Sequence, residues 1–175
     1  KRLDAEYIDA RKADYAKRGV KIREIRRSKI LFDQAIPYIL SLPETPLGKK
    51  LPVVLLLPGF RNLMESPYFD PVEEQFLTKN VAVMRIGLAR HGMHLENEEY
   101  FRRFVETVLN HVESLPELDV DNISIWGFSF GGYLGLRALA DECRLQGLAS
   151  GGRRASSMAL DAGARPGAAG SAVAP

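Results

Sequence analysis

The sequence predicts an α/β protein with a mostly parallel sheet and helices on both faces. The main evidence for the sheet is one continuously apolar segment, residues 51–57, and two mostly apolar ones, residues 81–86 (VAVMRI) and 122–126 (NISIW). Strands that are buried on both faces of a parallel sheet are apolar throughout. Between the last two segments, apolar residues recur at helical spacing over residues 98–115. Strands that alternate with helices favour parallel pairing through right-handed crossovers.

The first fifty residues follow a different pattern. Residues 1–19 predict a leading helix that ends at Gly19. Partly alternating apolar and charged residues predict a strand over 20–26, and a second strand over 36–42 stops at Pro43. We expect the helix and an antiparallel strand pair to flank the parallel sheet.

The last forty residues change in composition. A helix is predicted over residues 130–140 and a short strand over 145–150. Residues 1–150 are thus interpreted as the N-terminal portion of a single domain. Residues 151–175 are rich in Ala, Gly and Ser, so they bury too little apolar surface to offset chain entropy and are expected to be a disordered tail. We interpret this tail as a truncation or reading-frame artefact, with a linker to a further domain as the alternative.

Composition limits the possible functions. The chain has 175 residues, 46% of them hydrophobic and 26% charged, with a formal net charge of +2, so nothing in the overall charge favours nucleic acid. Cys143 has no internal partner, which favours a reducing, cytoplasmic compartment. No apolar run approaches the ~20 residues of a transmembrane helix. The sequence has no zinc spacing, P-loop or dinucleotide fingerprint, so no metal or cofactor is expected, and the oligomeric state stays open.

Basic residues are frequent between Arg11 and Lys29. A cluster of this kind is usually a solvated face. The alternative is a surface that docks an acidic partner or anionic lipid.

The segment GFSFG, Gly127–Gly131, is the main candidate for chemistry. It follows an apolar strand and precedes a helix, which is the context of a G-x-S-x-G nucleophile elbow. Ser129 would occupy a tight, strained turn with its hydroxyl above the sheet. Gly127 and Gly131 have no Cβ, so strand and helix can approach closely around it. The alternative is an ordinary glycine-rich turn.

In this context, residues 120–140 (VDNISIWGFSFGGYLGLRALA) resemble the elbow of α/β-hydrolases near the dienelactone hydrolase, prolyl oligopeptidase and fermentation–respiration switch esterase groups. Residues 51–60 and 76–92 resemble two further strand–loop segments of these proteins. The resemblance implies an α/β-hydrolase fold that is incomplete at the C-terminus. It also implies an acyl-enzyme on Ser129, formed from a small-molecule ester or amide, with the N–H groups of Phe60 and Phe130 as the oxyanion hole.

The sequence departs from the family pattern after the nucleophile. The expected order is Ser, then Asp or Glu, then His, but no His follows Ser129. Upstream, His91 is either an atypical base or a structural loop residue, and His111 is expected to be solvated on its helix. Asp161 is either the catalytic acid or an irrelevant carboxylate. The chain is therefore interpreted as an impaired serine hydrolase, with a truncated or pseudo-hydrolase that at most binds a ligand or partner as the alternative.

Overall fold

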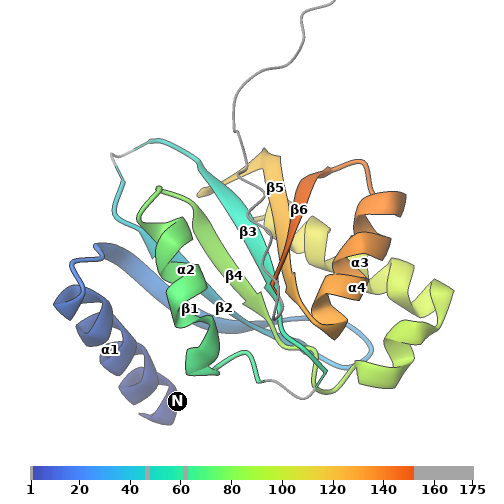
Figure 1. Cartoon of the computed structure of the whole chain (residues 1–175), viewed down its shortest axis with the longest axis horizontal. Helices are drawn as coiled ribbons and strands as arrows, with labels where there is room; N and C mark the ends of the chain where they lie inside the picture. Colours follow the sequence, from blue (N-terminus) through green and yellow to red (C-terminus); the bar gives the residue numbers. More distant parts are fainter. Residues whose placement is uncertain (1, 46–47, 61–62, 152–175) are drawn as a thin grey trace, which may run out of the picture.

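A six-stranded sheet forms the centre of the computed structural model, which describes residues 2–45, 48–60 and 63–151 (Figure 1). The strand order is β1-β2-β4-β3-β5-β6, in which β4, β3, β5 and β6 are parallel and β1 and β2 are antiparallel additions at one side. This arrangement confirms the predicted fold class. The strands are β1 (Ile22–Ile30), β2 (Ile36–Pro43), β3 (Leu51–Leu57), β4 (Ala82–Ile86), β5 (Leu118–Phe128) and β6 (Leu145–Gly151).

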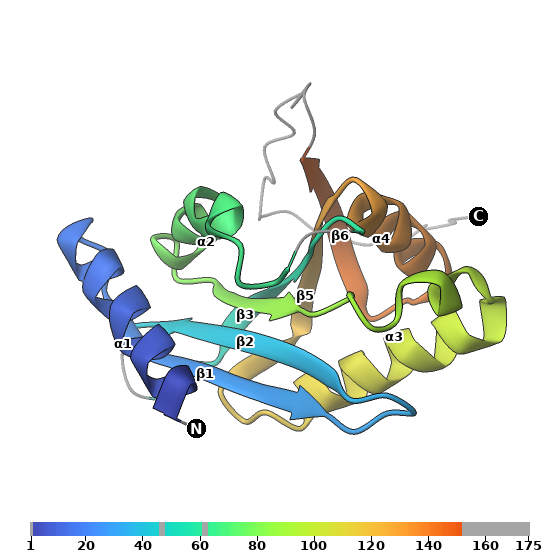
Figure 2. The same cartoon turned by 90° about the horizontal axis from the view of Figure 1, so that it is seen from below.

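The helices cover both faces of the sheet, with α1 and α2 on one face and α3 and α4 on the other (Figure 2). Their bounds are α1 (Arg2–Lys17), α2 (Asp70–Leu77), α3 (Glu98–Glu113) and α4 (Phe130–Asp141), with 3-10 turns η1 (Pro67–Phe69) and η2 (Gly92–Glu96). The sequence pattern does not predict α2, because its eight residues are too few to show a helical periodicity. Among the residues that the structure describes, no helix is long and apolar enough to cross a membrane.

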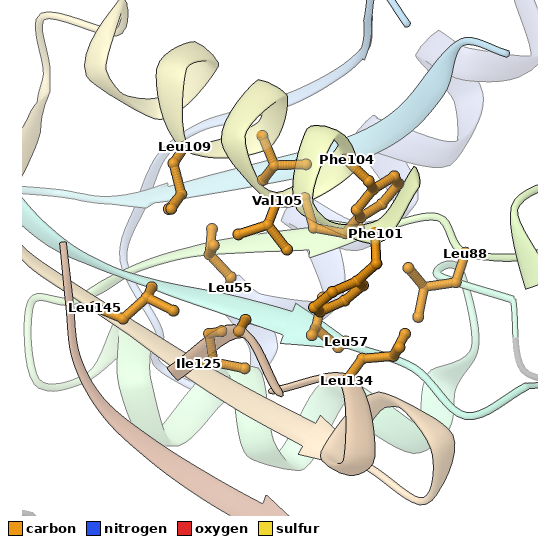
Figure 3. A pocket seen from close by; sticks show the side chains of 13 residues that line it. Leu55, Leu57, Leu88, Phe101, Phe104, Val105, Leu109, Ile125, Leu134 and Leu145 are labelled. Carbon is orange, nitrogen blue, oxygen red and sulfur yellow. The ribbon is translucent and has the colours of Figure 1, made fainter. Parts of the chain in front are cut away.

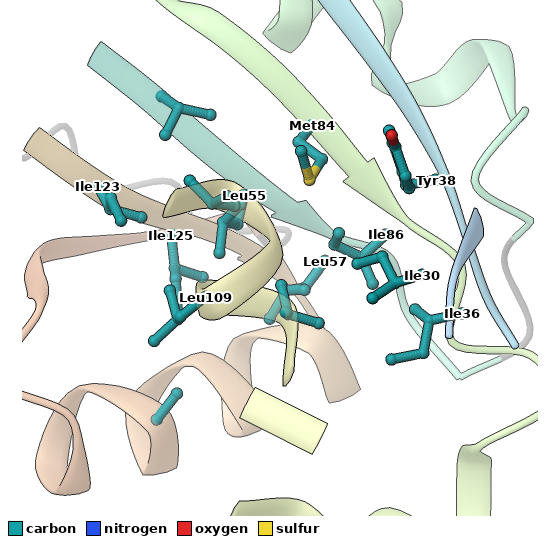
Figure 4. Packing of buried hydrophobic residues seen from close by; sticks show 14 of the residues in the cluster. Ile30, Ile36, Tyr38, Leu55, Leu57, Met84, Ile86, Leu109, Ile123 and Ile125 are labelled. Carbon is teal, nitrogen blue, oxygen red and sulfur yellow. The ribbon is translucent and has the colours of Figure 1, made fainter. Parts of the chain in front are cut away.

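Alternate side chains of the central strands enter two separate hydrophobic clusters. Leu55, Met84 and Ile125 point toward α3 and α4, where they pack around Leu109 (Figure 4). Val54 and Val83 point the other way, into a cluster that includes residues of α1 and α2. Because both faces are covered, these strands are apolar without alternation, as the sequence pattern indicated.

Two strands extend beyond their sequence signals. β1 continues to Ile30 because it pairs with β2 as far as Ile36. β5 begins at Leu118, which pairs with Leu51, and reaches Phe128. Backbone hydrogen bonds to a neighbouring strand lengthen these elements through polar residues that show no strand pattern of their own.

Candidate active site

Ser129 lies in the turn between β5 and α4. The strand ends at Phe128 and the helix begins at Phe130, as the elbow motif predicts. Ser129 has φ 53° and ψ −116°, and Asn80 is the other non-glycine residue with positive φ in the described ranges. Its ψ is far from the left-handed helical region, so the Ser129 backbone is strained. Strain of this kind persists only where the surrounding structure enforces it, and it concentrates at functional sites.

The two elbow glycines enforce the close approach of strand and helix. A Cβ on Gly127 would lie 2.4 Å from the carbonyl oxygen of Gly131. A Cβ on Gly131 would lie 2.2 Å from the carbonyl oxygen of Leu57 at the end of β3. Both distances are far below van der Waals contact, and both involve backbone atoms. Only glycine fits at either position in this backbone arrangement.

The segment after β3 packs against the Ser129 turn. A Cβ on Gly59 would lie 3.5 Å from the Cβ of Ser129. The Phe60 ring meets the Phe130 ring edge to face, with centroids 5.5 Å apart. The parallel pairing of β3 with β5 explains this meeting, because their carboxyl ends open at the same edge of the sheet. The structure thus brings Phe60, Ser129 and Phe130 together.

The N-terminus of α4 provides backbone donors beside Ser129. The amides of Gly132 and Tyr133 donate to the Ser129 carbonyl, at 2.9 and 3.2 Å. The amides of Phe130 and Gly131 precede these bonds and have no partner within the helix. Together with the helix dipole, they favour negative charge at this position. The Ser129 side chain itself is exposed, so a small molecule can reach it.

The structure places His91 in an aromatic cluster and gives it no contact with Ser129. Its side chain is fully buried, and Nδ1 lies 3.0 Å from the hydroxyl of Tyr100. The rings of Phe32 and Phe104 lie 6.0 and 5.1 Å away, centroid to centroid. Burial lowers the pKa of His91, despite an opposing hydrogen bond with the backbone of Ala35. The neutral imidazole therefore joins the β1–β2 hairpin to α3.

The other residues considered from sequence lie elsewhere. The expectation that His111 is solvated holds only in part, because the residue is half-buried: its Nε2 is buried and its ring lies 5.1 Å from that of Tyr38. The strand β1 contacts α3. The charged sequence of the helix does not predict this long-range contact. Asp161 and the tail over 151–175 lie outside the described residues, except for Gly151 at the end of β6. In the described ranges, no group of three or more His, Cys, Asp or Glu side chains is placed to hold a metal ion.

Several arginines of the basic N-terminal segment are engaged in ion pairs. Arg11 contacts Asp70 and Glu73, at 2.7 and 3.1 Å. Arg18 contacts Glu74 at 2.7 Å. These contacts hold α1 to α2. Arg11 is buried, so its charge serves the fold and the solvated-face interpretation does not hold at this residue. A docking surface for an acidic partner or anionic lipid stays a prediction.

A small apolar cavity lies between the sheet and the helices α3 and α4 (Figure 3). It holds about 30 Å³ of free space, and the side chains that line it are hydrophobic. Phe101 and Val105 of α3 face Leu55 and Ile125 of the strands across it. A volume near that of one water molecule, without polar partners, is a packing gap in the core.

Comparisons with known proteins agree with this geometry. No family model matches the chain. Hydrolase LUC6 of a Fusarium species is 33% identical over 111 residues, which cover 58% of this chain and 26% of that protein. α/β-Hydrolase ucsC of an Acremonium species is 35% identical over 106 residues, which cover 54% of this chain and 21% of that protein. The chain thus spans about a quarter of the length of these curated relatives.

A solved structure shows the same fold. The acylaminoacyl peptidase of Pyrococcus horikoshii superposes with a TM-score of 0.63 at 19% identity, over 79% of this chain and 24% of that one. At this identity the likeness is one of fold, and the curated relatives add the sequence similarity. With its mostly parallel sheet and its strained serine turn, the chain is related to the α/β-hydrolase superfamily.

Proposed function

We propose that this chain carries the nucleophile of a serine hydrolase, which acts on a small-molecule ester or amide through an acyl-enzyme on Ser129. The observation that carries the proposal is the strained backbone of Ser129, φ 53°, in a turn packed against Gly59. A serine that needed only to cap a helix would have no reason to hold this conformation. The hydrolase names of the two curated relatives support the reaction class.

In this proposal, the Ser129 hydroxyl attacks the substrate carbonyl carbon and the carbonyl oxygen becomes an oxyanion. The N–H groups of Phe60 and Phe130 stabilise this oxygen as charge develops on it. The contact between Gly59 and Ser129 and the edge-to-face contact of the two phenylalanine rings support this placement. Collapse of the oxyanion breaks the ester or amide bond and releases the alcohol or amine, which leaves with the proton from the serine hydroxyl. Water then hydrolyses the acyl-enzyme, releases the acid and restores the serine.

The attack by Ser129 requires a proton acceptor for its hydroxyl. A serine hydroxyl without a general base is a poor nucleophile near neutral pH. The sequence has no His after Ser129, and the contacts of His91 hold it in the aromatic cluster. We therefore expect slow turnover by this chain alone. Asp161 as the acid and His91 as an atypical base stay predictions.

Labelling with a fluorophosphonate, followed by intact mass, tests the nucleophile directly. We expect one phosphonyl adduct on the wild-type chain and on Ser114→Ala, a control at another exposed serine, and none on Ser129→Ala. A wild-type chain that stays unlabelled after long incubation would contradict the proposal. That result would favour a pseudo-hydrolase that only binds a ligand, for which the buried position of His91 is the supporting observation.

A further inference from the structure

Arg85 is an unusual residue for its position at the centre of the sheet. It lies in β4, paired with Ile39 of β2 on one side and Leu56 of β3 on the other. Its side chain is fully buried and points to the α1 and α2 face, because its strand neighbours Met84 and Ile86 belong to the opposite cluster. Burying a guanidinium is costly unless its charge is paired and its N–H groups are bonded. An apolar side chain would serve the core as well, so the contacts of Arg85 need another explanation.

The Arg85 side chain makes two kinds of contact. Nε donates to the buried carboxylate of Glu73, and Nη2 donates to Asp70 at 2.6 Å. Nη1 donates to the backbone carbonyls of Met64 and Ser66, both at 3.1 Å. The carboxylates balance the charge, and the carbonyl bonds fix the backbone of the segment that follows β3.

Charge balance alone does not require the carbonyl bonds. Arg11, from α1, shares the same two carboxylates and also donates to the hydroxyl of Tyr15, at 2.6 Å. Two guanidiniums thus face two carboxylates. Burial lowers the pKa of Arg11, but the attraction of Glu73 and the other neighbours outweighs it and raises the pKa overall. The hydrogen bonds from Nη1 of Arg85 to the two carbonyls are therefore separate from the ion pairs that its Nε and Nη2 make with the carboxylates.

The segment held by Arg85 also carries Phe60. At its start, Gly59 packs against Ser129. At its end, the Met64 side chain is buried in the α1 and α2 cluster, and a Cβ on Gly87 would lie 3.2 Å from its sulfur. Phe60, whose side chain is 47% exposed, lies between these two anchors, four residues before Met64. Phe60 thus follows the residue that packs against Ser129 and lies four residues before a carbonyl that Arg85 holds.

We propose that Arg85 is a positioning residue, which holds the segment after β3 through the carbonyls of Met64 and Ser66 and thereby places the Phe60 N–H toward Ser129. This inference rests on the proposed function for its catalytic consequence. The two hydrogen bonds from Arg85 to the carbonyls of Met64 and Ser66, called the clamp below, belong to the fold and do not depend on that function. Arg85 touches no reacting atom and acts through the backbone alone.

The variant Arg85→Lys tests the clamp because it keeps the positive charge but removes the planar guanidinium and its several N–H donors. A lysine ammonium is a single point with a flexible stem and cannot bridge both carboxylates and both carbonyls. Arg11→Lys is the matched control, because it disturbs the same two carboxylates without touching the segment. If Arg85→Lys does not fold, the double variant Arg85→Met/Glu73→Leu removes one charge of each sign and the carbonyl bonds together.

Two readouts on the full chain separate the clamp from the proposed function. The first is amide hydrogen exchange at Ser66 and Phe69, whose N–H groups donate to the carbonyls of Leu63 and Ser66. The second is the rate constant for fluorophosphonate labelling of Ser129. For Arg85→Lys, or for the double variant, we expect at least ~10-fold faster exchange at these amides. We also expect labelling to slow by at least ~10-fold, toward the ~10²–10³ that loss of one oxyanion donor costs. Arg11→Lys should change both by less than about 3-fold at matched global stability.

Equal effects of Arg85→Lys and Arg11→Lys would overturn the proposal, because the two guanidiniums would then act only through the shared carboxylates. Unchanged exchange at Ser66 and Phe69 would overturn it too. If the wild-type chain is never labelled, the proposed function fails and the catalytic role of Arg85 fails with it. The exchange comparison would still decide whether Arg85 holds the segment.

Discussion

Gly131→Ala is the sharpest test of the close contact between β3 and α4. The added Cβ would lie 2.2 Å from the Leu57 carbonyl oxygen and 2.7 Å from both the Leu57 carbonyl carbon and the Pro58 carbonyl oxygen. Ordinary contact begins near 3.4 Å, so the closest pair must separate by about 1.2 Å. All three atoms belong to the backbone, and no side-chain rotation can relieve the overlap.

The stability change is the balance of two opposite effects. Overpacking in a well-packed site costs about 1–3 kcal/mol, and a clash with backbone belongs at the upper end. Because Gly131 is in α4, the change to alanine also returns about 1 kcal/mol of helix propensity. We therefore expect Gly131→Ala to lower the free energy of unfolding by about 2 kcal/mol.

Urea unfolding measures this change. With a slope near 2 kcal/mol per molar, the midpoint should fall by about 1 M at an unchanged slope. Gly19→Ala is the control, because Gly19 has φ +76° with nothing within 4 Å of the added Cβ. That variant should lose about 1 kcal/mol from backbone strain alone and leave Ser129 labelling unchanged, whereas Gly131→Ala should suppress the labelling. A Gly131→Ala chain more stable than wild type, as helix propensity alone predicts, would refute the steric reasoning.

Three further outcomes are expected. Ser129→Gly should be about 1 kcal/mol more stable than Ser129→Ala in urea, because glycine adopts positive φ without strain; equal stabilities would show that the turn is not strained. Because the pKa of His91 is lower in the folded chain, the unfolded chain binds a proton more readily as pH falls. The free energy of unfolding should therefore be at its full value above the unfolded pKa of ~6.5 and decrease as pH drops below it. His91→Gln should weaken that dependence in pH-stepped urea titrations, and the remainder should come from His111, whose pKa is also lowered by burial. The exposed-residue control His94→Gln should keep the full dependence. Val108→Ile adds one methylene beside the cavity under α3 and should raise the free energy of unfolding by up to ~0.8 kcal/mol. The control Val20→Ile, in the other cluster, should not raise it. A loss of stability in Val108→Ile would mean that the cavity does not accept the added methylene.

The fold class and the position of the elbow follow from local patterns in the sequence. Residues 51–57 are apolar without alternation, and residues 81–86 are apolar apart from Arg85, as expected of strands that are covered on both faces. The string from Gly127 to Gly131 places a serine between a strand and a helix, because glycine is needed where backbones meet. Both signals are local, because each depends only on the residue types within a short segment of the chain.

The roles of several charged and aromatic residues depend on contacts between distant parts of the chain. Arg85 reads in the sequence as one polar residue in an apolar strand, and its partners lie 12 to 21 residues earlier in the chain. His91 reads as a loop residue, but Phe32 and Tyr100 enclose it from two different elements. His111 looks like a surface residue in the sequence, but Tyr38 of β2 packs against its ring. The physical reason is that burial and ion pairing depend on long-range packing, whereas periodicity and glycine placement depend on the local backbone.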